Sequence, residues 1–186
     1  MKTVMIKDLM VPLSEYATVK EDATMQEVAA ALKSAQAKFD RGSYPHQAVL
    51  VLDNQDKVVG KVGLIDILRA LEPKYDQLVQ PSSRLHTGFT RQFLKSLMGH
   101  YELWQQPLGD ICRIAGDRKV KNFMVSPSEG EFVDETATLD EAIHQLVMGH
   151  HQSVLVLRQK KIVGILRLTD VFETLSNILL QCPASP

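Results

Sequence analysis

The feature that most constrains the fold of this chain is an internal repeat. Four segments of the first half recur in the same order in the second half, at offsets of 114, 114, 105 and 104 positions: 6–11 with 120–125, 19–27 with 133–141, 46–52 with 151–157, and 58–60 plus 66–68 with 162–164 plus 170–172. A shared order over this length indicates two copies of one structural unit. The change of offset from 114 to 105 leaves nine additional residues in the first copy, around Ala37–Tyr44.

Each copy has the pattern of a short strand, a helix, two strands and a second helix. Thr24 and Thr138 each precede a glutamate by three residues, Glu27 and Glu141, which is typical of a helix N-terminus with a capping box. Apolar residues then follow at helical spacing and predict one buried stripe per helix: Met25, Val28, Ala29 and Leu32 in the first copy, and Leu139, Ala142, Ile143 and Leu146 in the second.

The second half of each copy predicts a strand pair and a closing helix. Residues 48–52 and 153–157 are apolar runs typical of strands covered on both faces, and second strands end near Gly60 and Gly164. The closing helices are expected to begin at Asp66 and Asp170, which are natural N-cap residues.

Residues 75–119 belong to neither copy, so the chain divides into a first repeat (1–74), a helical insert (75–119) and a second repeat with a short tail (120–186). After a polar loop through residues 81–83, a helix is expected from Thr90 to Pro107, with Phe93, Leu97, Tyr101 and Trp104 on one face. A second short helix follows, with Leu108, Ile111, Cys112 and Ala115 on one side. The insert is either a cap on the repeat core or a docking surface that uses Trp104 and Tyr101.

Composition excludes several classes of protein. The 186 residues carry 21 Lys+Arg and 22 Asp+Glu, and this balance does not favour binding to nucleic acid. No apolar run approaches the roughly 20 residues of a membrane-spanning helix, and no export signal is evident at the N-terminus. Cys112 and Cys182 are far apart in sequence, which fits free thiols in a reducing cytoplasm.

The residues that open and close each copy resemble the CBS domain, the regulatory module named after cystathionine β-synthase. The copies open with Met10-Val11-Pro12 and Met124-Val125-Ser126-Pro127, and close with a glycine followed six residues later by an aspartate, Gly60 to Asp66 and Gly164 to Asp170. The resemblance implies an α/β (α+β) fold in which two β-α-β-β-α repeats pack as a pseudo-twofold pair, which usually dimerises. It also implies clefts between the repeats that bind AMP, ADP, ATP or S-adenosylmethionine and thereby regulate a partner protein.

The chemistry of adenosine ligands suggests which residues bind them. A carboxylate accepts hydrogen bonds from both ribose hydroxyls, and Asp66 and Asp170 are the candidates, with a plain helix cap as the alternative role. The family pattern has Ser or Thr three residues before this aspartate, where this chain has Gly63 and Arg167. Because Thr169 precedes Asp170, the sequence favours the Asp170 cleft, and Arg167 is expected either to bind phosphate or to obstruct that cleft.

Family geometry pairs each aspartate with residues of the other copy. The partners expected for Asp170 are Ala17, Thr18, Tyr44, Pro45 and His46, and those expected for Asp66 are Phe132, His150, His151 and Gln152. His46 and His151 resemble the positions at which some members contact phosphate, where an imidazole would favour its charged form and binding would tighten at lower pH. The alternative for each histidine is a partly exposed turn residue.

Other functions have weaker support in the sequence. His144, His150 and His151 lack the spacing of a standard zinc site, so no metal is expected. No catalytic motif is present, and the chain is not expected to be an enzyme. The sequence thus predicts a stand-alone cytoplasmic sensor that is a homodimer, with a ligand-free protein-interaction module as the alternative.

Overall fold

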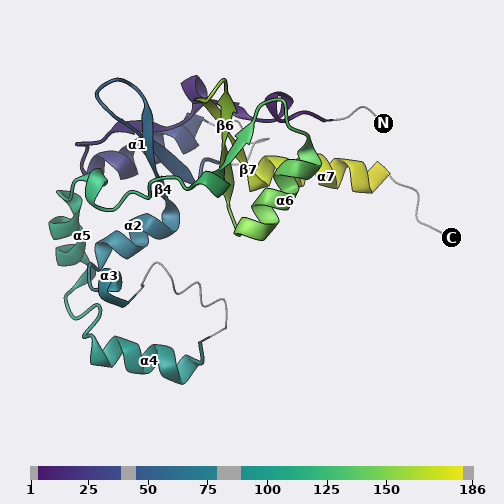
Figure 1. Ribbon diagram of the computed structural model, residues 1–186. Helices are drawn as coiled ribbons and strands as arrows, with labels where there is room; N and C mark the ends of the chain where they lie inside the picture. Colours follow the sequence, from purple (N-terminus) through teal and green to yellow (C-terminus); the bar gives the residue numbers. More distant parts are fainter. Residues whose placement is uncertain (1–3, 39–44, 79–88, 182–186) are drawn as a thin grey trace.

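A computed structural model describes residues 4–38, 45–78 and 89–181, and Figure 1 shows its two repeats side by side with the insert extending from the first. The predicted order of elements is present in both repeats. The elements of repeat 1 are β2 (Thr18–Lys20), α1 (Met25–Lys38), β3 (Ala48–Leu52), β4 (Val58–Gly63) and α2 (Leu64–Leu71). Those of repeat 2 are β5 (Phe132–Asp134), α6 (Leu139–Gly149), β6 (Ser153–Arg158), β7 (Lys161–Arg167) and α7 (Leu168–Gln181). The predicted α/β fold is confirmed.

The two repeats exchange their opening segments. Strand β1 (Val11–Pro12) pairs antiparallel with β7, so the sheet of repeat 2 has the order β1-β7-β6-β5, whereas repeat 1 has the order β2-β3-β4. In the other direction, Val125 forms an isolated antiparallel bridge with Lys61 of β4. Each repeat is therefore completed by the opening segment of the other repeat.

Two glycines make room for these exchanged segments. A Cβ atom at Gly164 would lie 2.6 Å from the carbonyl oxygen of Val11, and one at Gly60 would collide with the side chain of Met124. A larger residue at Gly164 would push the crossing backbone off the strand, and one at Gly60 would force the Met124 side chain to move. The glycines that close the strand pairs therefore mark where the repeats interlock.

The cores lie under helices α1 and α6. The predicted stripes are buried at Met25, Val28 and Leu32 and at Leu139, Ala142 and Leu146, while Ile143 is partly buried. Ala29 is exposed, contrary to prediction, because it points away from the sheet.

The predicted capping boxes form in one repeat only. Thr24 Oγ1 accepts a hydrogen bond from the Glu27 amide, 3.2 Å away, and the Glu27 carboxylate accepts one from the Thr24 amide, 2.6 Å away. Thr138 occupies the N-cap position of α6 but makes no such side-chain bond, so the second box was predicted wrongly.

The closing helices begin earlier than predicted. Strand β4 continues to Gly63, which is the N-cap residue of α2, and α7 starts at Leu168. Asp66 and Asp170 consequently lie inside the first turn of their helices and are not the N-cap residues, although the Asp66 side chain still accepts a hydrogen bond from the amide of the N-cap residue Gly63.

The insert contains three helices, α3 (Tyr75–Leu78), α4 (Arg91–His100) and α5 (Leu108–Gly116). Thr90 caps α4 as predicted, but the helix ends at His100, well before Pro107, because Glu102 and Trp104 adopt left-handed backbone conformations. Residues 81–83 and Tyr44 lie outside the described residues.

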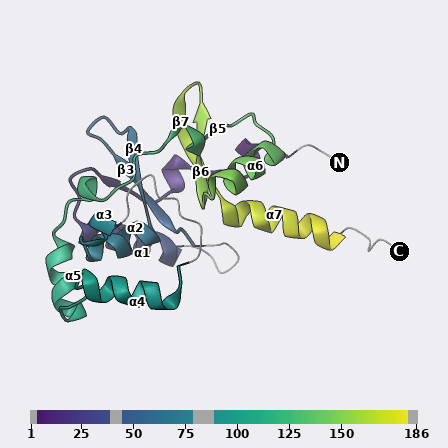
Figure 2. The same cartoon turned by 60° about the horizontal axis from the view of Figure 1, so that its bottom comes forward.

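The helices of the insert differ in how they contact the rest of the molecule. Helix α5 buries Ile111 and Ala115 against repeat 1, while Leu108 and Cys112 on its predicted apolar side are exposed. Helix α4 lies farther out, below α3 and α5 in Figure 1 and beside α5 in Figure 2, and its side chains are exposed except for Leu97. Within the described ranges, no helix is both long and apolar enough to cross a bilayer.

Candidate functional site

A cleft of about 520 Å³ opens between the two repeats, where β3 and β4 of repeat 1 face β6 and β7 of repeat 2. We call it the open cleft. Its walls come from both repeats: Tyr16, Gln47, Ala48, Lys61, Gly63, Leu64, Ile65 and Asp66, together with His150, His151, Gln152, Ser153, Arg167, Leu168 and Thr169. Seven of the residues singled out in the sequence therefore share one cavity.

Asp66 is the acidic side chain that lines this cleft. Its Oδ2 atom accepts a hydrogen bond from the Gly63 amide at 2.8 Å, which fixes the carboxylate at the start of α2. Burial raises the pKa of Asp66, while the Gly63 amide and the nearby cations Arg69 and Lys61 oppose this shift. The carboxylate is half-buried and keeps acceptor capacity beyond the Gly63 bond.

Lys61 and Glu131 form an ion pair across the two repeats. Lys61 Nζ lies 2.8 Å from Glu131 Oε2, and the two side chains are only 15% and 11% exposed. Burial acts to raise the pKa of Glu131, but the hydrogen bond and charge of Lys61 outweigh it and lower the pKa. The lysine that lines the cleft thus has a buried carboxylate as its partner.

The histidines of the open cleft follow the end of α6. His150 is the C-cap residue of this helix in a left-handed conformation, and His151 comes next. A side chain at Gly149 would overlap the His151 ring, so glycine leaves the space that this imidazole occupies. Both histidines and Gln152 line the same cavity as Asp66.

Asp170 differs from Asp66 because its carboxylate is hydrogen-bonded to Arg167. Arg167 Nε donates to Asp170 Oδ2 at 2.7 Å, and a second, shorter bond joins Arg167 Nη2 to Oδ1. The side chains are only 8% and 15% exposed. Arg167 was expected to bind phosphate or obstruct the cleft, and here it takes up both carboxylate oxygens of Asp170.

Two aromatic rings lie near this pair, and we call the group of Tyr16, His46, Arg167 and Asp170 the closed cleft, although Tyr16 and Arg167 also line one wall of the open cleft. The rings of Tyr16 and His46 meet edge to face with centroids 4.3 Å apart, and His46 is 1% exposed. Burial, followed by the charge of Arg167, lowers the pKa of His46 to about 4, with Asp170 opposing. Burial also raises the pKa of Tyr16 to about 12. Both rings are therefore neutral near pH 7.

Several residues expected to bind ligand lie outside the open cleft. Ala17 is buried, Thr18 pairs with Leu50 in the sheet of repeat 1, and Phe132 begins β5. Pro45 is exposed and does not line the cavity. The structure thus gathers the Asp66 set around a cavity, apart from Phe132, and leaves the described Asp170 partners in the protein interior or at its surface.

Lys61 and Glu131 were not among the residues predicted to form the site. The repeat itself contained a signal, because the corresponding positions in the other copy are Ile165 and Ala17. Repeat 1 has a lysine where repeat 2 has an isoleucine, and repeat 2 has a glutamate where repeat 1 has an alanine. Because a buried charge needs a partner of opposite charge, this pattern indicates that the lysine and the glutamate meet between the repeats.

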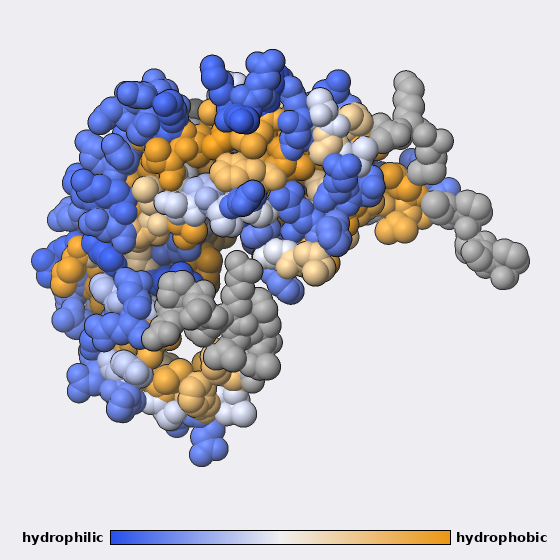
Figure 3. Space-filling view, viewed as in Figure 1, coloured by the Kyte–Doolittle hydropathy of each residue, from blue (hydrophilic) through white to orange (hydrophobic). Residues whose placement is uncertain are grey.

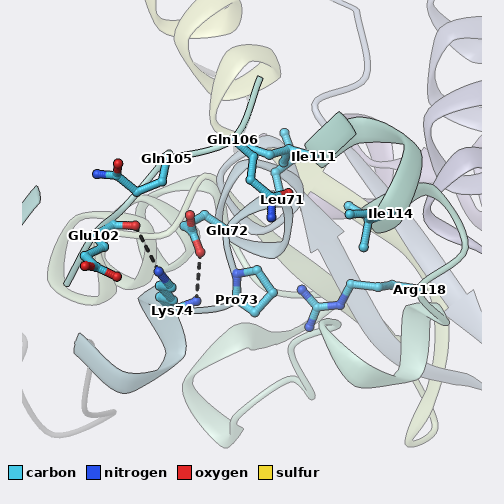
Figure 4. A pocket seen from close by; sticks show the side chains of 11 residues that line it. Leu71, Glu72, Pro73, Lys74, Glu102, Gln105, Gln106, Ile111, Ile114 and Arg118 are labelled. Atoms are coloured by element: carbon cyan, nitrogen blue, oxygen red, sulfur yellow. Dashed lines mark hydrogen bonds between the residues drawn. The ribbon is translucent and has the colours of Figure 1, made fainter. Parts of the chain in front are cut away.

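Two other cavities lie elsewhere. One of about 260 Å³ lies between the end of α2, the loop after α4 and helix α5 (Figure 4). There the buried Glu72 carboxylate accepts hydrogen bonds from the Lys74 and Trp104 amides at 3.3 and 2.9 Å, while Lys74 Nζ donates to the Glu102 carbonyl at 2.9 Å. The other cavity is shallow and lies along α6. Within residues 4–38, 45–78 and 89–181, no three His, Cys, Asp or Glu side chains are grouped to hold a metal ion.

A sequence model of the CBS domain matches residues 4–73 and 120–177. Because these segments make up more than half of the chain, the protein belongs to the CBS domain family. The two matched segments form a tandem CBS pair. A search among curated proteins gave no match.

Solved structures show the same fold. An uncharacterized conserved protein from Pyrococcus horikoshii has 16% sequence identity and a TM-score of 0.58, with 100% of this chain and 99% of that chain covered. CBSX2 of Arabidopsis thaliana in complex with AMP has 16% identity and a TM-score of 0.58, covering 95% and 98%. The CBS domain of a bacterial CNNM/CorC family Mg²⁺ transporter in complex with ATP has 14% identity and a TM-score of 0.57, covering 93% and 87%.

Proposed function

We propose that this protein is a regulatory module, not an enzyme, that binds an adenosine-type ligand in the open cleft beside Asp66. The observation that carries the proposal is the cavity of about 520 Å³, which has walls from both repeats and a half-buried carboxylate at a helix start. The AMP and ATP named in two structures of the same fold support this class of ligand.

The walls of the open cleft match the chemistry of adenosine. The Asp66 carboxylate can accept hydrogen bonds from the two ribose hydroxyls. Leu64, Ile65 and Leu168 are 46%, 65% and 38% exposed and offer apolar surface for the base. A ligand there contacts both repeats at once and favours the relative arrangement that it binds more tightly.

Helix α2 supports a route from the cleft to the insert. Its first turn carries Asp66, and at its C-terminal end the Ala70 carbonyl accepts a hydrogen bond from Arg118, which follows α5. Helix α5 also packs against α2. A shift of α2 on ligand binding would therefore move α5, and we propose that the insert transmits this shift to a partner protein.

We further propose that the module acts as a homodimer in the cytoplasm. Leu68 on α2 and Phe172 on α7 occupy corresponding positions in the two repeats and are 55% and 60% exposed. Figure 3 shows apolar surface toward the outer end of α7. Covering such residues is a common basis for association between identical subunits. The exposed Cys112 fits a reducing compartment.

The test is thermal unfolding and calorimetric titration of dialysed protein with adenosine, AMP, ADP, ATP and S-adenosylmethionine, with GTP as a control. A ligand at about 100 times its dissociation constant should raise the midpoint by roughly 5 to 10 °C. We expect one ligand per chain, loss of binding in Asp66→Asn, and retained binding in Asp170→Asn. Loss of binding in Asp170→Asn alone would contradict the site.

The second candidate is a protein-interaction module that has no small ligand. The exposed apolar side chains of α4 favour it, because Phe93, Leu94 and Met98 are 45%, 48% and 48% exposed. Figure 3 shows apolar surface at α4 as well. Trp104 is less suited to docking than predicted, since its Nε1 donates to the Tyr75 hydroxyl at 3.1 Å. No thermal shift with any adenosine compound would favour this second function.

A further inference from the structure

The cations that line the open cleft are already neutralised by the protein. Lys61 is paired with Glu131 at 2.8 Å, and Arg167 is paired with Asp170 through two hydrogen bonds. All four side chains are at most 15% exposed. A phosphate that recruited either cation would leave a buried carboxylate without its partner, which is strongly unfavourable.

The N-terminus of α2, which lines the open cleft, already has a carboxylate as its hydrogen-bond partner. Helix N-termini commonly bind phosphate through backbone amides. At α2, however, the Gly63 amide donates to the Asp66 carboxylate of the same chain, and Gly63 has no hydroxyl to offer. A phosphate at this point would instead meet the negative charge of Asp66.

The remaining charged and polar groups do not reverse this balance. Arg69 is close enough to influence Asp66 but does not line the cleft. The neutral imidazoles of His150 and His151, the amide of Gln152 and the hydroxyl of Thr169 hydrogen-bond to hydroxyls and amines as well as to phosphates, so in this form they do not distinguish the ligand classes.

We propose that the open cleft selects adenosyl compounds whose 5′ substituent is uncharged or cationic, and discriminates against polyphosphates. This inference rests on the proposed function and narrows its ligand class. Adenosine is the uncharged probe, and S-adenosylmethionine, whose 5′ sulfonium is positive, is the cationic one. Each added phosphate brings further negative charge toward Asp66 and the two ion pairs.

Calorimetric titration with adenosine, S-adenosylmethionine, AMP, ADP and ATP at one salt concentration tests the inference. We expect affinity to fall along the series from adenosine to ATP, with ATP at least about tenfold weaker than adenosine. ATP binding as tightly as adenosine, or more tightly, would overturn the inference and leave the proposed function standing. Absence of binding by all five compounds would overturn both.

Two substitutions test the cause of the selectivity. Glu131→Gln keeps a hydrogen-bond acceptor for Lys61 but removes the neutralising charge, so ATP affinity should rise about tenfold while adenosine affinity stays constant. Glu129→Gln is the matched control, because Glu129 is exposed in the same 3₁₀ turn and does not line the cleft. Equal effects of the two substitutions on ATP affinity would contradict the role of the Lys61–Glu131 pair.

Gly63→Ser provides an independent test that leaves the ion pairs intact. A Cβ atom at Gly63 would lie 3.4 Å from Asp66 Oδ2, an ordinary contact, and the backbone φ of −86° suits any residue. The new hydroxyl should raise AMP affinity severalfold without changing adenosine affinity. Unchanged AMP affinity in both Gly63→Ser and Glu131→Gln would overturn the explanation.

Discussion

The open and closed clefts occupy corresponding places in two copies of one repeat, but their aspartates have different surroundings: Asp66 lines a cavity of about 520 Å³, whereas the carboxylate of Asp170 is paired with Arg167. At the position three residues before the aspartate, repeat 1 has Gly63 and repeat 2 has Arg167. The guanidinium of Arg167 binds Asp170 as a ligand hydroxyl pair would, whereas Gly63 leaves the Asp66 carboxylate beside a cavity. The side chain at the end of the second strand therefore determines whether the aspartate of the repeat is paired within the protein or borders a cavity.

The largest expected contrast is in stability. Asp170→Ala should lower the free energy of unfolding by about 3 to 5 kcal/mol, because buried Arg167 then lacks its carboxylate. Asp66→Ala removes only a bond to the helix start and should cost about 1 kcal/mol. Urea unfolding of both variants measures the difference. Similar losses would mean that Asp66 and Asp170 contribute equally to stability, which would contradict the proposed difference between the two clefts.

The next largest effect is on ligand binding. The substitution Gly63→Arg places an arginine in the open cleft at the position that Arg167 has in the closed cleft. In Gly63→Arg the new guanidinium can pair with Asp66 and fill the cavity, so adenosine affinity should fall about 100-fold, or roughly 2.7 kcal/mol. Gly63→Ala is the control that keeps the cleft open. Titration calorimetry compares the two variants, and wild-type affinity in Gly63→Arg would disprove the assigned position of the ligand.

A smaller effect is expected on how the free energy of unfolding depends on pH, because His46 is buried in the closed cleft. The pKa of His46 is lowered to about 4 in the folded protein, whereas an unfolded histidine titrates near 6.5. Below pH 6.5 the unfolded state therefore gains a proton that the folded state does not take up until about pH 4. This contribution lowers the stability by about 1.4 kcal/mol per pH unit over that window.

The variant His46→Gln isolates this contribution. Its unfolding free energy should fall less than that of the wild type between pH 6.5 and 5, by about 2 kcal/mol. Denaturant unfolding at several pH values measures the slope. His144→Gln on the exposed face of α6 serves as control and should retain the wild-type slope. Parallel curves for all three proteins would show that His46 is not held neutral.

The smallest expected difference is in the stability of helices α1 and α6, which cover the two sheets. Thr24→Ala removes a formed cap of α1 and should cost about 1 kcal/mol. Thr138→Ala removes a residue with no cap bond from its side chain and should cost clearly less. Thermal unfolding compares them, and a larger cost for Thr138→Ala would reverse the assignment.

The sequence predicted what local patterns determine. The repeat order, the buried strands β3 and β6 and the cap at Thr24 depend on residues close together in the chain. The end of α4 was misjudged because apolar spacing continues to Trp104 while the backbone has already left the helix. The starts of α2 and α7 were misplaced because each strand passes directly into its helix, at Gly63–Leu64 and Arg167–Leu168, without the expected connecting loop.

The site was harder to predict because its charges meet only after the repeats pack. Lys61 and Glu131 are separated by 70 positions in sequence, and neither is recognisable as a ligand residue by itself. The Thr169-Asp170 pair favoured the second cleft in the sequence, since side-chain type alone does not show that Arg167 lies within reach of Asp170. Sequence patterns thus defined the candidate aspartates, and packing determines which of them borders a cavity.

The exchange of β1 also has a consequence for how the chain is made. During synthesis, β1 emerges first among the described strands. Its partner β7 emerges last. The sheet of repeat 2 is therefore completed only after nearly the whole chain has been translated, and a nascent repeat 1 has an incomplete neighbour until then. Pairing at this sequence distance slows folding. We expect the two repeats to fold and unfold as one cooperative unit, and either half expressed alone to be prone to aggregation.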